Sequence, residues 1–285
     1  MTASPDLVRK VIAANIAVHS KLAAHYETSE PHFRSENVAK VERWITNLVA
    51  ATQAQSVLDL GCGTGFVIQI LKRHVPHITG VDVTSAMLER VDRSGTASVE
   101  LVKNDTGTYP VEKGAFQLVT AYSFLHHLCD LAPTLGTAAR ALGPGGKFYA
   151  DLEPNYYFWE VINQLERGGT YHPLVQREIE AVTFKDEEIE QKFGVSRETF
   201  NHAEFGKDIA GGFKQEELER LLREAGFSQV EFFYHWFLGE GFMINREGTP
   251  REERFQHAEI VNEALQSALP ASRNLFKYLG FVATK

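Results

Sequence analysis

Residues 57–65, with the sequence VLDLGCGTG, constrain the fold more than any other part of the chain. An apolar strand here runs into glycines at positions 61, 63 and 65, and a stretch of helical character follows over residues 66–74. Glycines let a ligand approach the backbone without an intervening Cβ, and the free amides at a helix N-terminus attract polar or anionic groups. The segment therefore predicts a strand, a tight turn and a helix that together form a ligand site.

A carboxylate follows the next apolar strand at a spacing that nucleotide sites use. Residues 78–81 read ITGV and lead into Asp82. An acidic side chain about twenty residues after the first glycine reaches the hydroxyls of a ribose. The glycine loop and Asp82 together predict a nucleotide-type ligand.

The glycine spacing indicates which nucleotide fits. A dinucleotide loop reads G-x-G-x-x-G and leaves room for a pyrophosphate, whereas here the third glycine comes one residue early, at Gly65, and Phe66 takes the dinucleotide position. Asp59 lies just before the loop, where its charge repels a pyrophosphate but accepts hydrogen bonds from an ammonium group. A ligand with a ribose, an amino acid group and no phosphate satisfies both observations, and S-adenosylmethionine is such a ligand.

Further stretches, in order along the chain, extend this pattern. The chain resembles the class I S-adenosylmethionine-dependent methyltransferases of the small-molecule branch over residues 55–155 and 211–237. Residues 1–50 and 156–210 match no pattern that we can name. The matching stretches are an adenine-contacting segment (104–106), the fourth strand (116–122), the segment after it (123–128), the turn before the fifth strand (142–147), and the flanks of the helix before the sixth strand (211–218 and 225–227).

The alternation of apolar strands with helical segments predicts an α/β fold. We expect a doubly wound, mostly parallel, seven-stranded, Rossmann-like sheet with N-terminal helices and a helical lid insertion after the fifth strand. A long insertion at the carboxyl end of a strand lies over the ligand crevice; the alternative is a helical embellishment that only packs. The expected parts are an N-terminal helical clamp (1–52), an S-adenosylmethionine-binding core (53–155), the lid insertion (156–210) and the C-terminal part of the core sheet (211–285).

Charge and cysteine content restrict the partners and the compartment. The formal net charge is -8 and there is no run of lysine and arginine, which argues against a nucleic-acid substrate. The only cysteines are Cys62, inside the glycine loop, and Cys129, and their positions predict no disulfide. No secretory segment or membrane span is visible. We therefore expect a cytoplasmic monomer or homodimer that acts on a small-molecule acceptor and binds neither nucleic acid nor membrane.

The resemblance implies a set of cofactor-binding residues. The three loop glycines lie under the amino acid and ribose groups, Asp59 lies near the ammonium group, and Asp82 binds the ribose hydroxyls. Asp105 accepts from the adenine amino group, unless it is a simple turn aspartate, and the backbone of Tyr122 holds the methionine end. The full set is Tyr26, Arg34, Asp59, Gly61, Cys62, Gly63, Gly65, Asp82, Val83, Met87, Asn104, Asp105, Thr106, Tyr122, Ser123 and His127.

Methyl transfer from a sulfonium is an in-line displacement, and alignment alone can supply most of the catalysis. The candidates for acid–base chemistry are His126, His127, Glu153 and Tyr26. A histidine suits a general base near neutral pH. Adjacent residues point to different sides of a helix or strand, so we expect no metal on the two histidines. The alternative to a base is that one histidine caps the following turn and the other lines the pocket.

The segment 25–34 has the composition of a clamp over the cofactor. In methyltransferases of similar outline a tyrosine before the core approaches the sulfonium, and Tyr26 matches it here, since an aromatic face attracts such a cation. Arg34 is placed to pair with the cofactor carboxylate; the alternative for both residues is surface packing. Glu153, after the fifth strand, is expected to orient an acceptor amine or act as a base, or else to pair with a lysine of the insertion.

The leading functional hypothesis is transfer of the methyl group of S-adenosylmethionine to O, N or C of a small, apolar or aromatic acceptor. One alternative keeps the cofactor but changes the reaction to attack by its own amino group, because the site and not the fold decides the chemistry. Another is a non-catalytic cofactor-binding protein. The intact glycine loop and Asp82 argue against a degenerate site.

Overall fold

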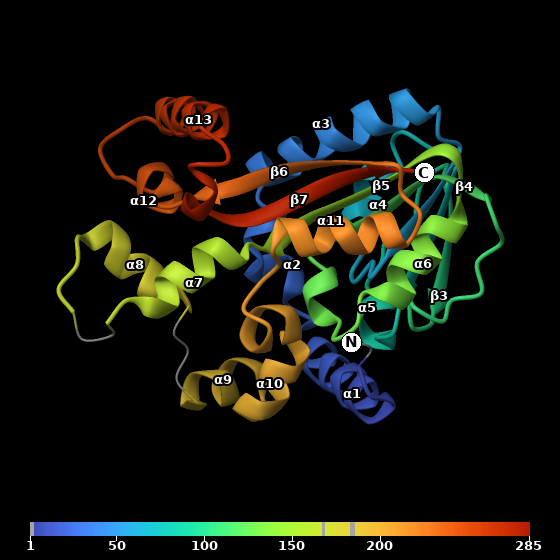
Figure 1. The fold of residues 1–285 in the computed structure, drawn as a ribbon, viewed down its shortest axis with the longest axis horizontal. Coiled ribbons are helices and arrows are strands. Elements are labelled where there is room, and N and C mark those ends of the chain that lie inside the picture. The colour runs from blue at the N-terminus through green and yellow to red at the C-terminus, as the bar shows by residue number, and fades with distance from the viewer. Residues whose placement is uncertain (1–2, 167–168, 183–185) are drawn as a thin grey trace.

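A seven-stranded sheet forms the centre of the computed structural model, which describes residues 3–166, 169–182 and 186–285 (Figure 1). The strand order is β3-β2-β1-β4-β5-β7-β6. Strands β1 to β5 run parallel, and β7 lies antiparallel to both of its neighbours. This confirms the expected doubly wound, mostly parallel sheet. The strands are β1 (Ser56–Leu60), β2 (His77–Asp82), β3 (Ser98–Lys103), β4 (Phe116–Tyr122), β5 (Leu142–Pro154), β6 (Gln229–Phe237) and β7 (Phe276–Thr284).

Helices cover both faces of the sheet (Figure 1). Residues of α3 and α4 share one apolar cluster with the sheet, and residues of α6 and α11 share the other. The helices are α1 (Pro5–Leu22), α2 (Tyr26–Ser29), α3 (Ser35–Thr52), α4 (Phe66–Leu71), α5 (Ser85–Leu88), α6 (Ala132–Ala141), α7 (Tyr156–Gln164), α8 (Pro173–Val182), α9 (Asp186–Phe193), α10 (Arg197–Ala203), α11 (Gln215–Glu224), α12 (Glu240–Ile244) and α13 (Arg251–Ser267), with short turns η1 (Pro31–Phe33), η2 (Leu125–His127), η3 (Phe205–Ile209) and η4 (Arg273–Leu275).

The strand order reverses between β1 and β4, and this reversal fixes where a ligand can bind. β1 pairs with β2 on one side and with β4 on the other. Connections on the two sides of such a point leave toward opposite faces of the sheet, so a crevice opens above the carboxyl ends of the strands. The glycine loop leaves β1 at this crevice, as the sequence predicts.

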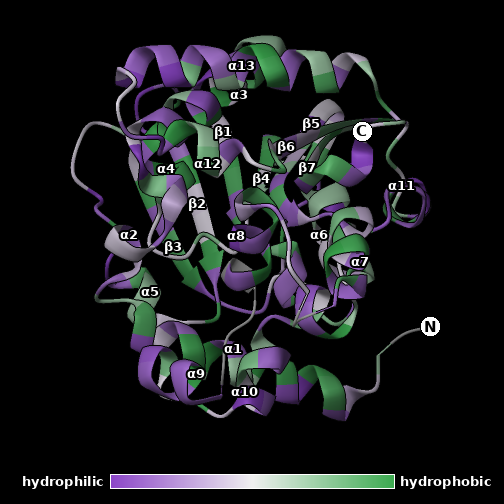
Figure 2. Ribbon diagram, turned by 90° about the vertical axis from the view of Figure 1, so that its left-hand side faces the viewer, coloured by the Kyte–Doolittle hydropathy of each residue, from purple (hydrophilic) through white to green (hydrophobic). Residues whose placement is uncertain are grey.

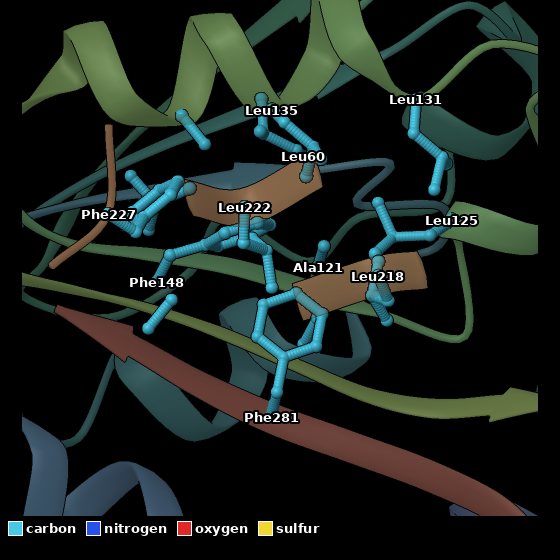
Figure 3. Packing of buried hydrophobic residues seen from close by; sticks show 14 of the residues in the cluster. Leu60, Ala121, Leu125, Leu131, Leu135, Phe148, Leu218, Leu222, Phe227 and Phe281 are labelled. Carbon is cyan, nitrogen blue, oxygen red and sulfur yellow. The ribbon is translucent and has the colours of Figure 1, made fainter. Parts of the chain in front are cut away.

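Apolar side chains pack the two faces of the sheet into separate clusters. Figure 3 shows Phe148 of β5 beside Phe227 and beside Leu222 of α11, with Phe281 of β7 in the same cluster. The next residue of β5, Tyr149, belongs to the other cluster, where it packs with Ile45 of α3. Successive side chains of a strand point to opposite faces, so a central strand of this sheet is apolar on both sides. The continuous apolar runs in the sequence reflect this double burial.

The first helix, α1, lies away from the sheet and packs against α5, α9 and α10. It begins after Ser4, whose side chain accepts a hydrogen bond from the backbone N–H of Leu7 at 3.3 Å. Figure 2 shows hydrophobic and hydrophilic residues distributed around α1, α9 and α10 at the lower end of the molecule. Buried residues of α1 include Val11 and Val18. An amphipathic helix of this kind needs a second apolar surface, which α9 and α10 provide.

The described part of the insertion 156–210 supports α1, and none of it lines the crevice. Ile189 and Phe193 of α9 and Phe200 of α10 form a small core with Ala14 and Val18 of α1. The first part of the insertion, α7, contacts β7 and η4 on the other side of the molecule. No described residue of the insertion belongs to the cavity lining given below. The expected lid is therefore not confirmed, because α1 takes the covering position.

Cys62 and Cys129 are both free, as expected. Among the residues that the structure describes, no helix has the length and apolar character that crossing a bilayer requires. The division of the chain at residues 52, 155 and 210 stays a prediction.

Candidate functional site

A cavity opens at the carboxyl ends of β1, β2 and β4, and α1 closes its outer side. Segments far apart in the sequence converge on it, as expected for a cofactor site at the switch point of the sheet. The predicted cofactor residues that line it are Tyr26, Asp59, Gly61, Cys62, Gly63, Asp82, Val83, Met87, Asp105, Thr106, Tyr122, Ser123 and His127.

Three predicted cofactor residues lie outside this lining. Arg34 is exposed at the position before α3, so the structure does not support its pairing with a cofactor carboxylate. Asn104 accepts a hydrogen bond from the hydroxyl of Thr108 at 3.3 Å. Gly65 starts α4 with φ 90°, and a Cβ there would come within 2.9 Å of Val91 Cγ1. Its contribution is to the shape of the turn, because L residues rarely adopt this conformation.

The glycine loop forms a cradle that a ligand can enter. At Gly61, with φ 68°, an added Cβ would lie only 2.0 Å from the ring of Phe124, so glycine is required there. At Gly63 an added Cβ would meet nothing within 4 Å, so the backbone there is open. Thr64 lines the cavity with a buried hydroxyl that has no hydrogen-bond partner in the described part of the chain. A polar ligand over the loop would satisfy that hydroxyl.

Asp82 connects the glycine loop to the second strand. Its Oδ2 accepts a hydrogen bond from the backbone N–H of Gly63 at 3.0 Å, and its Oδ1 accepts one from Thr84 at 2.8 Å. Each carboxylate oxygen has further lone-pair capacity, so the side chain can still accept from two ribose hydroxyls. The side chain therefore fixes the loop and faces the cavity at the same time.

Asp59 is a buried carboxyl at the floor of the cavity, 2% exposed. Burial raises the pKa of Asp59 to about 7, although the hydroxyl of Thr120 donates to its Oδ1 at 2.7 Å and partly offsets this rise. A buried carboxyl without a cationic partner resists ionisation. An ammonium group in the cavity would supply that partner, which fits the predicted role of Asp59.

Asp105 has the contacts of a turn aspartate, and its role toward an adenine stays a prediction. Its Oδ1 accepts from the backbone N–H groups of Gly107 at 2.7 Å and Thr108 at 3.2 Å, which is the pattern of a turn aspartate. The residue also lines the cavity, as does its buried neighbour Thr106. These bonds use Oδ1, so Oδ2 keeps acceptor capacity for a ligand in the cavity.

Helix α1 belongs to the predicted N-terminal clamp (1–52), but none of its residues was among the predicted site residues. Val8, Val11, Ile12, Asn15 and His19 line the cavity from one face of this helix. These residues have the spacing of an ordinary amphipathic helix. The spacing is the same whether such residues pack into a core or line a ligand cavity. A search for the polar residues within that stripe would have found Asn15 and His19.

His32 was also missed, and it holds the N-terminal segment against the core. The ring is 3% exposed, and burial lowers the pKa of His32 to about 4. Its centroid lies 5.0 Å from that of Phe66 and 5.6 Å from that of Tyr122. This neutral ring docks the segment that contains Tyr26, whose centroid is 5.9 Å away.

Tyr26 reaches the cavity as predicted, at the first residue of α2. Burial raises the pKa of its hydroxyl, and the nearby carboxylates of Glu30 and Glu204 raise it further. The hydroxyl therefore stays protonated and able to donate a hydrogen bond. Tyr26 is suited to contact a cation through its ring face and not to act as a base.

His127 lines the cavity with a neutral ring. Its Nδ1 lies 2.7 Å from the carbonyl oxygen of Ala203, so Nδ1 carries the proton and Nε2 the lone pair. Burial lowers the pKa of His127 well below its usual range, and the neighbouring His126 lowers it further. A neutral imidazole with Nε2 unprotonated has the form of a general base.

The two adjacent histidines lie side by side, contrary to the expectation that they point to different sides. Their ring centroids are 4.1 Å apart, because η2 is a short turn and neither a regular helix nor a strand. In Glu204 of the insertion, Oε2 lies 3.8 Å from His126 Nε2 and Oε1 lies 3.8 Å from His127 Nδ1. Ligand-type atoms of these three residues lie within 4.8 Å of one another, so the geometric argument against a metal pair is wrong. The absence of a metal stays a prediction.

Glu153 serves the backbone of η2 and does not line the cavity. Its fully buried carboxylate accepts from the N–H groups of Phe124, Leu125 and His126 at 2.8–3.0 Å, and it lies 2.8 Å from His126 Nδ1. Burial lowers the pKa of His126, but the charge of Glu153 and this hydrogen bond more than offset burial and leave it raised. We expected Glu153 to contact an acceptor or a lysine of the insertion. Its partners are instead the backbone and the imidazole of residues 124–126.

Comparison with known proteins identifies the class of this core. Residues 58–150 match a family described as methyltransferase domain. An uncharacterized methyltransferase from Mycobacterium bovis is 32% identical over 93 residues, which cover 32% of this chain and 47% of that protein. A ubiquinone biosynthesis O-methyltransferase from Bordetella avium is 29% identical over 152 residues, covering 50% of this chain and 62% of that protein. The chain spans about half the length of the curated relatives it matches.

Solved structures agree with this assignment at the level of the fold. A SAM-dependent methyltransferase from Archaeoglobus fulgidus has a TM-score of 0.55 at 18% identity, covering 92% of this chain and 100% of that chain. An S-adenosylmethionine-dependent methyltransferase from Mesorhizobium loti has a TM-score of 0.51 at 18% identity, covering 86% and 96%. The chain therefore has the fold of these S-adenosylmethionine-dependent methyltransferases, and residues 58–150 match the methyltransferase domain family.

Proposed function

We propose that this chain binds S-adenosylmethionine in the cavity above β1, β2 and β4 and transfers its methyl group to a small-molecule acceptor. One observation carries the proposal. Asp59, the open backbone at Gly63, Asp82 and Asp105 line a single cavity. They belong to or follow the neighbouring strands β1, β2 and β3, and this order matches that of an ammonium group, a ribose and an adenine in the cofactor. The unpaired hydroxyl of Thr64 adds a polar group to the same surface.

Each of these residues has a defined binding role. Asp59 pairs with the ammonium group, Asp82 accepts from the ribose hydroxyls, and Asp105 accepts from the adenine amino group through Oδ2. Tyr26 places an aromatic face near the sulfonium end. When bound, S-adenosylmethionine supplies an electrophilic methyl group on a positively charged sulfur.

The chain's own contribution to the reaction is alignment and exclusion of water. Helix α1 covers the cavity with the apolar side chains of Val8, Val11 and Ile12. Holding an acceptor in line with the methyl group supplies most of the acceleration that such a displacement needs. Where the acceptor carries a proton, His127 Nε2 is a group in the lining that is able to take it. The alternative is that His127 only lines the cavity wall and takes no proton. The same position of the ring allows this role as well.

We further propose a small, apolar or aromatic acceptor methylated at O, N or C. The acidic balance of the chain, with a net charge of -8, supports such an acceptor over a nucleic acid. The same proposal places the protein in the cytoplasm as a monomer or homodimer.

Product analysis tests the reaction type. The protein is incubated with S-adenosylmethionine carrying ¹³C in the methyl group and with a mixed panel of phenols, amines and carbon acids, and the products are separated by mass spectrometry. A labelled acceptor together with S-adenosylhomocysteine supports methyl transfer. Methylthioadenosine in place of both indicates attack by the cofactor's own amine, and cofactor binding without any product indicates a non-catalytic binding protein.

A further inference from the structure

His19, in the last turn of α1, lines the cofactor cavity beside His127 and Tyr26. Its ring centroid lies 4.8 Å from that of His127, at an interplanar angle of 84°, and 6.4 Å from that of Tyr26. Two imidazoles therefore lie at the end of the cavity that contains Tyr26. Their surroundings differ, and this difference separates their roles.

Asn15 fixes both the position of His19 and the nitrogen that carries its proton. Nδ1 of His19 lies 2.9 Å from the backbone oxygen of Asn15, so Nδ1 carries the proton and Nε2 the lone pair. The Asn15 side chain donates from Nδ2 to the backbone oxygen of His127 at 3.0 Å, which ties this turn of α1 to η2. No residue in the described part of the chain hydrogen-bonds to Nε2 of His19. That lone pair is free for a ligand in the cavity.

A base must hold the proton that it takes, and three features favour this at His19. The ring lies in the last turn of α1, where the partial negative charge of a helix C-terminus attracts a cation. The carboxylates of Glu204 and Glu30 both interact electrostatically with the ring, and they attract the charge that it gains with a proton. The side chain is partly exposed, so water can take the proton afterwards.

His127 lies in a less favourable environment for a proton. Its side chain is only 12% exposed, and burial together with the neighbouring His126 lowers the pKa of His127 well below its usual range. An imidazole that resists protonation can accept a hydrogen bond but is a poor base. His127 is therefore suited to line the wall and to pack edge-on against the ring of His19.

We propose that His19 is the catalytic base for an acceptor that carries a proton on the atom to be methylated, such as a hydroxyl group. As the acceptor oxygen forms its bond to the methyl carbon, the carbon–sulfur bond breaks and leaves its electron pair on sulfur. In the same step the hydroxyl proton passes to Nε2 of His19, from which water removes it. This role rests on the methyl transfer proposed above and adds the residue that takes the proton.

Turnover of the acceptor found by product analysis tests the catalytic role. His19→Gln keeps a polar side chain that cannot take a proton, and we expect kcat to fall about a hundredfold while the affinity for S-adenosylhomocysteine stays the same. His202→Gln is the matched control and is expected to leave turnover unchanged. His202 lies in the last turn of α10, and its Nδ1 is 2.6 Å from the backbone oxygen of Glu198, but it is outside the cavity lining.

Addition of imidazole distinguishes a base from a wall residue. His19→Ala leaves space beside the cavity, and imidazole from solution is expected to restore its turnover at least about tenfold. A residue that only packs against its neighbours would not be replaced in this way. His202→Ala with imidazole is the control for effects of the reagent on the parent reaction.

Chemical modification tests the free Nε2 without any turnover. Diethyl pyrocarbonate reacts with unprotonated imidazole nitrogens, and peptide mass spectrometry locates the modified histidines. In the parent protein we expect His19 and His202 to react, since both have Nδ1 bonded to a backbone oxygen and Nε2 free. His126, which is buried and bonded to Glu153, is expected to stay unmodified.

The outcomes separate this role from the proposed function. If the parent methylates an acceptor and His19→Gln keeps turnover within threefold, the base is wrong and the proposed function stands. If the parent binds S-adenosylhomocysteine but yields no labelled acceptor, the proposed function is wrong and the base with it. A fall in turnover that imidazole does not restore, or an unmodified His19 beside a modified His202, would also overturn the role of His19.

Discussion

His126 Nδ1 lies 2.8 Å from Oε2 of Glu153, and both side chains are buried. The same carboxylate binds the three successive backbone N–H groups of residues 124–126. A short turn between a strand and a helix leaves such donors without partners, and here one side chain satisfies them all. The position of His127 at the cavity wall depends on this arrangement.

Glu153 should consequently be a determinant of stability. Glu153→Ala leaves three buried N–H groups and a buried imidazole without their partner, which we expect to destabilise the fold by about 3–5 kcal/mol. Thermal unfolding followed by circular dichroism measures the loss. Glu112→Ala, at an exposed glutamate, is the control. A midpoint for Glu153→Ala within about 2 °C of the parent would contradict this role.

The affinity for S-adenosylhomocysteine should depend on pH through Asp59. The pKa of Asp59 is raised to about 7 by burial, so the group is largely protonated below that pH and must lose its proton to pair with an ammonium. Affinity should therefore rise with pH, gaining about tenfold from pH 5.5 to 7. It should fall again above about pH 8, where an α-amino group loses its charge. Calorimetric titrations across this range give the profile.

Asp59→Asn provides the control for that profile. The amide cannot ionise, so the variant should bind more weakly at neutral pH and lose the rise between pH 5.5 and 7. A variant that keeps the rising part of the profile would show that another group causes it. The pairing of Asp59 with the ammonium would then have to be abandoned.

Residues 26–34 and helix α1 should become more protected when the cavity is filled. The segment 26–34 consists of two short turns joined at Pro31, and His32 and Tyr26 tie it to the cavity wall. Short elements with few independent anchors open readily, and a ligand stabilises the closed state. Hydrogen exchange with and without S-adenosylhomocysteine measures the difference. Equal exchange in both states would remove the idea of an N-terminal clamp.

The His127→Ala variant distinguishes alignment from general base catalysis. We expect turnover of the acceptor found by product analysis to fall less than about tenfold, because the displacement needs no proton removed before the barrier. A general base would instead contribute about a hundredfold or more, with cofactor affinity nearly unchanged. His257→Ala, at an exposed histidine of α13 outside the cavity lining, is the control. A thousandfold fall with intact binding would make His127 catalytic.

The sequence predicted the floor of the site because glycine spacing and strand-end carboxylates follow from local backbone rules. Asp59, Gly63 and Asp82 converge as expected, since parallel strands end at one edge of the sheet. The walls were less predictable, because long-range packing places them. The apolar stripe of α1 has the pattern of a core helix, and only the fold shows that part of it faces a cavity. Glu153 likewise lies at the end of the fifth strand, where a residue that binds substrate is expected. Its contacts are with the turn at residues 124–126, and only the fold shows this.

Binding of S-adenosylhomocysteine to the parent and to Asp82→Asn tests the central claim most directly. Asp82 carries two roles, because its carboxylate orders the glycine loop and faces the ribose position. Asp105→Asn, at the adenine end, and the dinucleotide NADH serve as comparison variant and comparison ligand. We predict one site for S-adenosylhomocysteine on the parent, no binding of NADH, and a loss of affinity of about a hundredfold in Asp82→Asn, measured at a temperature where circular dichroism shows that the variant is folded. An affinity within threefold of the parent in Asp82→Asn, or tight binding of NADH, would contradict the assignment of this cavity to S-adenosylmethionine.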